Sequence, residues 1–227
     1  MTDPLYIVVD GLTGAGKSTL IEQMIVPELT DAGYMVVFVR ELAADYGQLL
    51  VDYYADPRRW AYTFQTKVIR DRVENFRRLY NEYTIGNTGD MRLVFVSERD
   101  EHADAVFAQV HRELGNMTAI EYQCYRDIWQ TFVDSLPMRA DITIYLDVSV
   151  EESLHRIQQR GRDGEVVDES YQRMLAEAAR PKVSSNIIIT DDFDDENLSQ
   201  LFDLMSIVYD EREIERGSSA TGSSATH

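Results

Sequence analysis

The feature that most constrains this chain is a glycine loop placed directly after a short apolar run. Residues 5–10 read Leu-Tyr-Ile-Val-Val-Asp, and residues 11–18 read Gly-Leu-Thr-Gly-Ala-Gly-Lys-Ser. The spacing Gly-x4-Gly-Lys-Ser between a predicted strand and a predicted helix is typical of a phosphate-binding P-loop; the alternative is a glycine-rich turn that binds nothing. In a P-loop the backbone N–H groups and the lysine contact phosphates, and the serine hydroxyl binds Mg²⁺. The predicted ATP-binding residues are Gly11, Leu12, Thr13, Gly14, Ala15, Gly16, Lys17, Ser18 and Thr19.

Apolar runs and helical patterns alternate along the chain. The runs predict strands over 5–10, 34–39, 92–96, 141–146 and 186–190. Apolar residues at helical spacing predict helices over 17–31, 57–80, 101–114, 118–136, 150–160, 168–179 and 195–213. Continuous apolar strands alternating with helices indicate an α/β fold, a doubly wound five-stranded parallel sheet flanked by helices. Ligands of such folds bind beyond the carboxyl ends of the strands.

The length of the chain predicts one domain with a short tail. The 227 residues are enough for one well-buried core, which we place over residues 1–215. Residues 217–227 contain no apolar side chain larger than alanine. We therefore expect a disordered low-complexity tail over residues 216–227.

Charge and composition exclude several classes of partner. The chain has 22 Lys and Arg residues against 40 Asp and Glu residues, a net charge of −18. This charge repels nucleic-acid phosphates and anionic lipids, so we expect no nucleic-acid polymer and no membrane as partner. The single cysteine, Cys124, has no internal disulfide partner, and we expect it to be half-buried. No apolar run has the length of a membrane span or the place of a signal peptide, which predicts a cytoplasmic protein.

Acidic and basic residues follow two of the predicted strands. Glu41 comes after the strand at 34–39, and Glu98 and Arg99 come after the strand at 92–96. Glu41 could take a proton from an attacking hydroxyl, and Arg99 could keep it ionised. Glu98 could complete a Mg²⁺ site with Ser18. A plain surface ion pair is an equally good interpretation of these residues from the local sequence.

An arginine cluster lies at the end of the predicted helix 150–160. Arg156 and Arg160 share a helix face, Arg162 follows, and glycines stand at 161 and 164. Like charges at this spacing disfavour each other unless an anion lies between them. We interpret residues 156–166 as an arginine-rich lid that closes over a triphosphate; a solvated basic face is the alternative.

These residues together resemble the deoxyribonucleoside kinase family, whose members transfer a phosphoryl group from a nucleoside triphosphate to the 5′-hydroxyl of a deoxynucleoside. The resemblance covers about residues 5–190. It implies the P-loop nucleoside and nucleotide kinase type of fold, with ATP and Mg²⁺ as cofactors and a homodimer. It rests on five matches in the family's order: the P-loop, Glu41, the segment Trp-Ala-Tyr-Thr-Phe-Gln at 60–65, the pair Glu98-Arg99, and the segments at 145–149 and 156–162.

The resemblance also implies roles for single residues. Glu41 corresponds to the general base and Arg99 to the arginine beside the 5′-oxygen. Lys17 and the lid arginines Arg160 and Arg162 then act on the transferring group, with Arg156 also at the donor. The implied substrate contacts are Gln65 reading the nucleobase, Phe64 and Tyr46 lining its pocket, and Tyr54 with Glu165 holding the sugar 3′-hydroxyl.

Two further positions bear on which base is bound. Arg72 lies two helical turns after Gln65, and Asp104 lies six residues after Glu98. An Arg–Asp pair resembles members of the family that prefer deoxyadenosine, deoxyguanosine or deoxycytidine over thymidine. The residue after Arg99 is usually serine in the family and is Asp100 here, which leaves the alignment of Asp104 open.

The sequence therefore predicts a deoxynucleoside kinase. A thymidylate-kinase-like enzyme is the nearest alternative, although a carboxylate at Glu41 would repel the phosphate of its acceptor. A P-loop NTPase that acts as a switch is the second alternative, and no segment of this chain resembles the Walker B strand with a terminal aspartate that is typical of such proteins.

Overall fold

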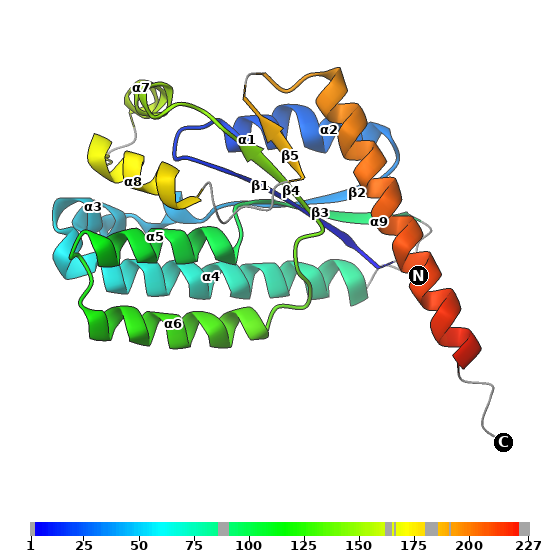
Figure 1. Cartoon of the computed structure of the whole chain (residues 1–227), viewed down its shortest axis with the longest axis horizontal. Helices are drawn as coiled ribbons and strands as arrows, with labels where there is room; N and C mark the ends of the chain where they lie inside the picture. Colours follow the sequence, from blue (N-terminus) through cyan, green and yellow to red (C-terminus); the bar gives the residue numbers. More distant parts are fainter. Residues whose placement is uncertain are drawn as a thin grey trace. The chain divides into compact units, whose positions relative to one another are not determined.

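The apolar runs of the sequence form one five-stranded sheet in the structure, a computed structural model that describes residues 3–85, 91–161, 165, 167–179, 186–190 and 192–222 (Figure 1). All strand pairings are parallel and the order is β2-β3-β1-β4-β5. The prediction of a doubly wound parallel sheet is therefore confirmed. The strands are β1 (Leu5–Gly11), β2 (Met35–Val39), β3 (Leu93–Glu98), β4 (Ile142–Leu146) and β5 (Ile187–Ile189).

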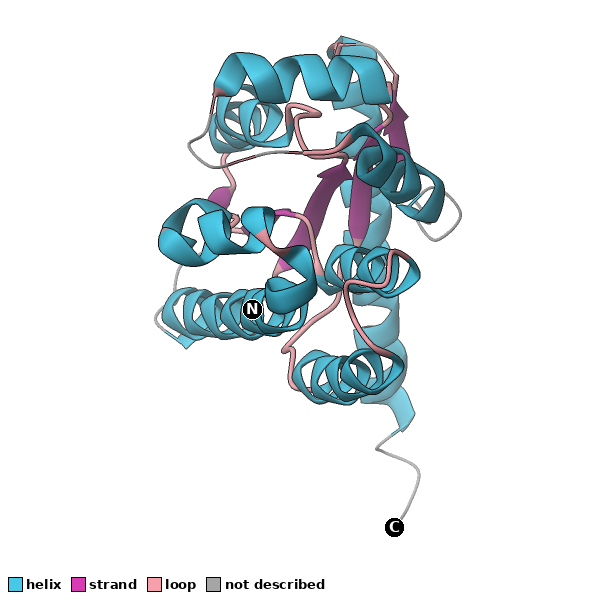
Figure 2. Ribbon diagram, turned by 90° about the vertical axis from the view of Figure 1, so that its left-hand side faces the viewer, coloured by secondary structure: helices cyan, strands magenta, loops and turns pink. Residues whose placement is uncertain are grey.

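Helices cover both faces of this sheet, as Figure 2 shows from the side. Helices α1, α2 and α7 lie over one face, and α4, α5 and α6 lie over the other (Figure 1). A π-helical turn, Ile21–Ile25, joins α1 to α2, and a 3₁₀ turn, Ala43–Tyr46, precedes α3. The helices are α1 (Lys17–Leu20), α2 (Val26–Asp31), α3 (Gln48–Ala55), α4 (Pro57–Ile85), α5 (Glu101–Glu113), α6 (Ala119–Asp134), α7 (Val150–Arg160) and α8 (Glu169–Ala179).

One apolar cluster joins the sheet to the long helix α4. The ring of Phe76 from α4 stacks on Tyr6 of β1 with 4.6 Å between ring centroids, and it meets Phe95 of β3 edge-on at 5.5 Å. Phe76 and Phe95 are almost completely buried. Burial of one such side chain contributes roughly 1.5–3 kcal/mol, so this contact fixes α4 against the sheet.

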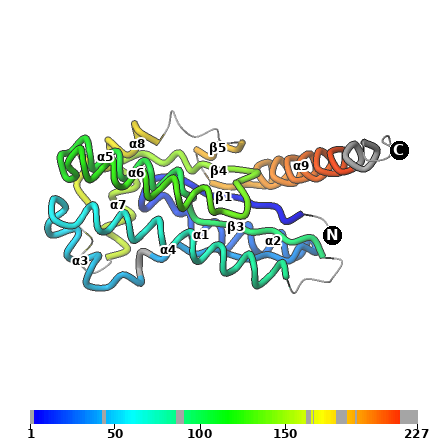
Figure 3. Tube along the Cα trace, turned by 90° about the horizontal axis from the view of Figure 1, so that it is seen from below, coloured from blue at the N-terminus to red at the C-terminus, as the bar shows by residue number. Residues whose placement is uncertain are grey.

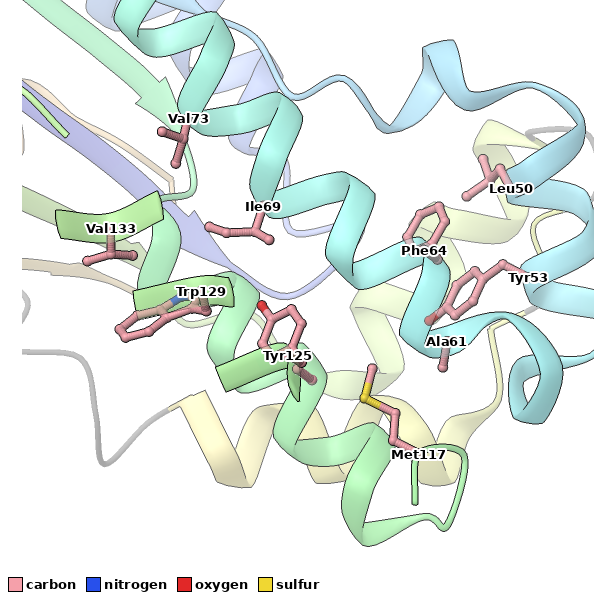
Figure 4. Close-up of a cluster of buried hydrophobic side chains, with 11 residues drawn as sticks. Leu50, Tyr53, Ala61, Phe64, Ile69, Val73, Met117, Tyr125, Trp129 and Val133 are labelled. Atoms are coloured by element: carbon pink, nitrogen blue, oxygen red, sulfur yellow. The ribbon is translucent and has the colours of Figure 1, made fainter. Parts of the chain in front are cut away.

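A second apolar cluster lies among α3, α4, α5 and α6 (Figure 4). The ring of Tyr53 from α3 stacks on Phe64 from α4 at 4.2 Å, with 7° between the ring planes. The indole N–H of Trp129 from α6 donates to the backbone carbonyl of Glu101 at 2.8 Å. Helices α4 and α6 run side by side along this cluster, as the trace in Figure 3 also shows. The cluster therefore holds α3 in place although α3 contacts the rest of the fold mainly through α4.

The structure forms two compact units, Met1–Asp191 and Asp192–His227. The second unit contains α9 (Asp195–Gly222), whereas the sequence predicted a helix over 195–213 and a disordered tail over 216–227. Residues 211–216, which are mostly Glu and Arg, have high helix propensity and favour a helix that continues past 213, whereas the glycines and serines after 216 do not favour it. Cys124 is exposed on α6, so the expectation of a half-buried cysteine is wrong. Among the described residues, no helix is long and apolar enough to cross a membrane.

Candidate active site

The glycine loop after β1 surrounds the amine of Lys17. Gly16 has φ of 99°, a left-handed conformation that favours glycine, and the chain turns there into α1. The Nζ of Lys17 donates to the backbone carbonyls of Leu12 at 2.8 Å and Gly11 at 3.2 Å. Burial, together with nearby Arg99, lowers the pKa of Lys17 to about 8 although the Glu98 carboxylate opposes the shift. The lysine is thus held inside the loop as a cation that phosphates can reach.

Oxygen atoms meet beside this loop where β1 and β3 end. The hydroxyl of Ser18 donates to Oε2 of Glu98 at 2.7 Å, and Oε1 of Glu98 lies 3.7 Å from Nζ of Lys17. Glu98 is brought there by the parallel register of β1 and β3, in which Val9 lies opposite Glu98. The predicted pairing of Ser18 with Glu98 is present in the structure.

Arg99 connects the glycine loop to Glu41. One guanidinium nitrogen donates to Oε1 of Glu41 at 2.7 Å, and another donates to the hydroxyl of Thr13 at 3.2 Å. Among the described residues, Arg99 is the only residue other than glycine with a positive φ, 63°. Backbone strain of this kind is concentrated at functional sites. The strained turn directs the side chain of Arg99 into the site instead of along β3.

The Glu41 carboxylate is ionised in this environment. Burial by itself would raise its pKa, but the charges of Arg99, Lys17 and Arg72 outweigh that effect and hold the pKa well below its usual range. Glu41 therefore accepts hydrogen bonds at neutral pH. The structure supports neither a fully solvated Glu41 nor a surface ion pair, because Arg99 is 4% exposed.

A cavity of about 430 Å³ opens between the glycine loop and helices α3, α4 and α8. Its volume is in the range of small-molecule sites. Gly11, Leu12 and Ala15 do not line it; the first two accept hydrogen bonds from Lys17 behind the loop. Arg162 lies outside the described residues. The predicted residues that line the cavity are Thr13, Gly14, Gly16, Lys17, Ser18, Thr19, Glu41, Tyr46, Tyr54, Phe64, Gln65, Arg72, Glu98, Arg99, Asp104, Arg156, Arg160 and Glu165.

A bidentate ion pair between Arg72 and Asp104 lines the cavity. Nε of Arg72 donates to Asp104 at 2.7 Å and a terminal nitrogen donates at 3.1 Å. Arg72 also donates to the backbone carbonyl of Glu98 at 3.0 Å. Burial raises the pKa of Asp104 to about 6, although Arg72 opposes the shift. The structure thus brings together the two residues whose alignment the sequence left open.

Each described lid arginine makes its own ion pair. Arg156 donates to Glu152 at 2.7 Å and to the backbone carbonyl of Ala15 at 3.0 Å. Arg160 donates to both carboxylate oxygens of Glu165, at 2.7 and 2.6 Å. The carboxylates of Glu152 and Glu165 thus bind the two guanidinium groups that were predicted to bind an anion. Binding of a triphosphate by Arg160 therefore requires exchange of the Glu165 contact.

A second carboxylate cluster is already satisfied by the protein. Asp100, Glu101 and His102 could hold a metal ion by distance. However, Asp100 accepts hydrogen bonds from the backbone N–H groups of His102 and Ala103, and Glu101 accepts one from Arg139. The cluster also stands at the positive end of the α5 dipole, which disfavours a cation.

The sequence did not identify several residues that shape the cavity. Tyr53 and Tyr171 line it, and both hydroxyls contact Nε2 of buried His111, at 2.6 and 3.2 Å. In the sequence, the one indication for Tyr53 is that it stands next to Tyr54, which was predicted to contact the substrate. No periodic pattern distinguishes His111 from the other polar residues of α5. Its tyrosine partners come from α3 and α8, so its contacts depend on how these two helices pack against α5.

This sheet order, glycine loop and buried Glu41–Arg99 pair define a P-loop phosphotransferase. The family model of deoxynucleoside kinases matches residues 7–207, and the chain belongs to that family. A deoxyadenosine kinase of Dictyostelium discoideum is 29% identical over 70% of this chain and 58% of its own length. A deoxyadenosine/deoxycytidine kinase of Bacillus subtilis is 29% identical over 70% of this chain and 67% of its own. A deoxyguanosine kinase of D. discoideum is 29% identical over 85% and 66%. The matched region thus spans less than two thirds of both Dictyostelium relatives.

Proposed function

We propose that this protein transfers the γ-phosphoryl group of ATP to the 5′-hydroxyl of a deoxynucleoside. The observation that carries the proposal is the Arg99–Glu41 pair at 2.7 Å, because it places an ionised hydrogen-bond acceptor next to the glycine loop in a cavity lined by both polar and apolar side chains. In this arrangement Glu41 orients the hydroxyl and accepts its proton, while Lys17 and Arg99 stabilise charge on the transferring group. Family membership and the names of the relatives support the same activity.

The acceptor end of the cavity suits an uncharged nucleoside. Gln65 is 3% exposed and lines the cavity, where its amide can form two hydrogen bonds with a base edge. The rings of Tyr46 and Phe64 meet edge-on at 5.5 Å and provide the apolar wall. Tyr54 and Glu165 line the same cavity and are proposed to hold the sugar 3′-hydroxyl. The 5′-phosphate of a monophosphate acceptor would lie against the Glu41 carboxylate, and the repulsion between the two negative charges disfavours such an acceptor.

Ser18 and Glu98 fit a magnesium ion. Mg²⁺ prefers oxygen ligands and keeps several waters, and the two side chains offer neighbouring oxygens next to Lys17. When bound, the ion neutralises charge on the donor phosphates. We propose these two residues as its protein ligands. The homodimer and the cytoplasmic location remain predictions from the resemblance and the sequence.

A panel of acceptors with ATP and Mg²⁺ tests the function. We expect phosphorylation of deoxyadenosine, deoxyguanosine or deoxycytidine, measured as kcat/KM, in excess of thymidine. Monophosphates used in preference to nucleosides would identify the thymidylate-kinase-like alternative. Phosphate release at the same rate with and without an acceptor would identify an NTPase that acts as a switch.

The Arg72–Asp104 pair gives the proposed base preference a separate test. We propose that the side chains of this bidentate pair disfavour a thymine methyl group sterically and offer a donor and an acceptor to an amino-bearing base. We expect Arg72→Met with Asp104→Ala to raise thymidine turnover relative to deoxyadenosine and deoxycytidine. Arg78→Met with Glu82→Ala is the matched control, because this ion pair is exposed and both of its residues lie on α4, the helix that carries Arg72. An unchanged ratio in the first double variant would rule out this pair as the determinant of base preference.

A further inference from the structure

We propose that Ser153 and Gln172 are positioning residues that hold one peptide of the glycine loop in its phosphate-binding orientation. The peptide is Thr13–Gly14. The inference rests on the proposed function only in that the loop binds the triphosphate donor. Neither side chain lines the cavity, so both would act through the loop backbone.

Three hydrogen bonds join the carbonyl oxygen of Thr13 to the side chains of Ser153 and Gln172 and these two side chains to each other. The hydroxyl of Ser153 donates to this oxygen at 2.7 Å, and Nε2 of Gln172 donates to it at 2.8 Å. The same Nε2 donates to the hydroxyl oxygen of Ser153 at 2.6 Å. Both lone pairs of the carbonyl and both amide hydrogens are therefore used. Ser153 and Gln172 are completely buried, so water does not compete for these bonds.

The geometry of a trans peptide turns this anchor into an orientation of the loop. The C=O and N–H groups of one planar trans peptide point in opposite directions. The Thr13 carbonyl points toward α7 and α8, which carry Ser153 and Gln172. The N–H of Gly14 therefore points away from these helices, toward the cavity that Gly14 lines. An N–H fixed in this direction is a phosphate donor that needs no rearrangement when the anion arrives.

Helix α7 packs so closely against the glycine loop that Gly14 has no room for a side chain. A Cβ atom on Gly14 would lie 2.6 Å from the carbonyl oxygen of Ser153 and 2.9 Å from the side chain of Ile157. Gly14 also has φ of 82°, which side chains rarely adopt. Glycine is thus required here so that Ser153 can reach the carbonyl of the preceding residue.

Gln172 is a poor choice for stability alone. Its Oε1 atom is buried and has no hydrogen-bond partner among the residues that the structure describes. A buried unsatisfied acceptor costs stability, whereas an apolar side chain of the same size would not. A residue kept there for packing would be apolar, so the unsatisfied oxygen indicates that the two N–H donors serve the loop.

The anchor also connects the loop to the lid. Helix α7 ends at Arg160 and helix α8 begins at Glu169, so the predicted lid, residues 156–166, begins in the last turns of α7 and precedes α8 in the sequence. Arg156 of α7 holds a second loop carbonyl, that of Ala15. Both helices that carry the lid are therefore fixed to the loop next to Gly14.

Binding of Mg·ATP and of Mg·tripolyphosphate, measured by calorimetry, tests the proposal without requiring turnover. Gln172→Met removes both amide donors at similar size. We expect its dissociation constants for Mg·ATP and for tripolyphosphate to rise about tenfold, which corresponds to about 1.4 kcal/mol. Binding of the deoxynucleoside should change less than twofold, and the melting temperature should stay the same or rise. Gln123→Met, at an exposed position on α6, is the matched control and should bind as the wild type.

The combination with Ser153→Ala distinguishes positioning from packing. Both side chains act on one carbonyl, so the double variant should weaken tripolyphosphate binding by less than the product of the two single effects. Unchanged tripolyphosphate binding in Gln172→Met would overturn the proposal. A lower melting temperature with equal weakening of donor and acceptor would also overturn it, since that result describes a structural residue.

The proposed function can fail separately. A wild-type chain that binds Mg·ATP but phosphorylates no deoxynucleoside would contradict the kinase activity and would leave the binding comparison valid. A wild-type chain that binds neither ATP nor tripolyphosphate would overturn both.

Discussion

At the scale of single residues, Glu41 bears most of the proposed chemistry. Glutamine at this position keeps the size of the side chain but carries no negative charge and takes up no proton. We expect Glu41→Gln to lower kcat by roughly 10²–10⁴-fold, the usual contribution of a general base. The KM for the deoxynucleoside should change little, and steady-state kinetics separate the two constants. Glu74→Gln, at an exposed position on α4, serves as the control; near-normal kcat in Glu41→Gln would remove Glu41 from this role.

Buried His111 gives the free energy of unfolding a pH dependence. Burial lowers the pKa of its imidazole from 6.5 to about 4. Above pH 6.5 the ring is neutral in both states. As the pH falls from 6.5 toward 4 the unfolded chain binds a proton that the folded chain does not, so stability is lost. The difference in pKa corresponds to about 3 kcal/mol.

The comparison of His111→Gln with the wild type isolates this effect. Asp104, whose pKa is raised to about 6, titrates in the same range with the opposite sign, because the folded state binds its proton more tightly. Urea unfolding at pH 7, 6 and 5 should show a shallower loss of stability in the variant. Exposed His155→Gln should leave the profile unchanged. Parallel profiles for His111→Gln and the wild type would show that His111 does not contribute.

Residues at strand ends could be predicted from the sequence, whereas residues that depend on helix packing could not. The carboxyl ends of parallel strands meet at one edge, so Ser18 and Glu98, like Glu41 and Arg99, were predicted to be near each other, and they are. Ser153 and Gln172 were missed because they are the polar residues on otherwise buried helix faces. Their partner is a backbone carbonyl, which no sequence pattern reveals.

At the scale of elements, all five strands and most helices lie close to where the sequence placed them. Helix α3 was missed because its eight residues are too few for a clear apolar period. The helix predicted over 17–31 contains a π-helical turn, Ile21–Ile25, which ends two residues before Pro27 of α2. Proline has no N–H to donate, so the regular ladder of hydrogen bonds is interrupted in this turn.

Asp100 shows why a departure from the family's serine is tolerated. Its Oδ1 accepts from the backbone N–H groups of His102 at 2.9 Å and Ala103 at 3.1 Å, so Asp100 is the N-cap of α5. Serine and aspartate are both good N-caps. We expect Asp100→Ser to retain the free energy of unfolding and Asp100→Ala to lower it by about 1 kcal/mol, measured by urea denaturation. Equal stability of these two variants would contradict the capping role.

At the scale of the whole molecule, the charge of −18 opposes the binding of an anionic donor. The carboxylates responsible for this charge are mostly exposed, whereas Lys17 and Arg99 are 3% and 4% exposed. Salt screens exposed charges much more than buried ones. Added salt should therefore weaken the long-range repulsion of ATP more than it weakens the local attraction to the loop.

We expect the second-order rate constant for Mg·ATP binding to rise severalfold as NaCl increases from about 20 to about 200 mM, because screening reduces the repulsion between the chain and the donor. Stopped-flow measurements follow this constant directly. The rate constant for an uncharged deoxynucleoside should not change, which makes the acceptor its own control. A rate constant for Mg·ATP that falls with salt would show that the buried cations dominate at long range as well.

If only a deoxynucleoside monophosphate binds, and its rate constant rises with salt as that of ATP does, the acceptor carries a phosphate and the role proposed for Glu41 is wrong.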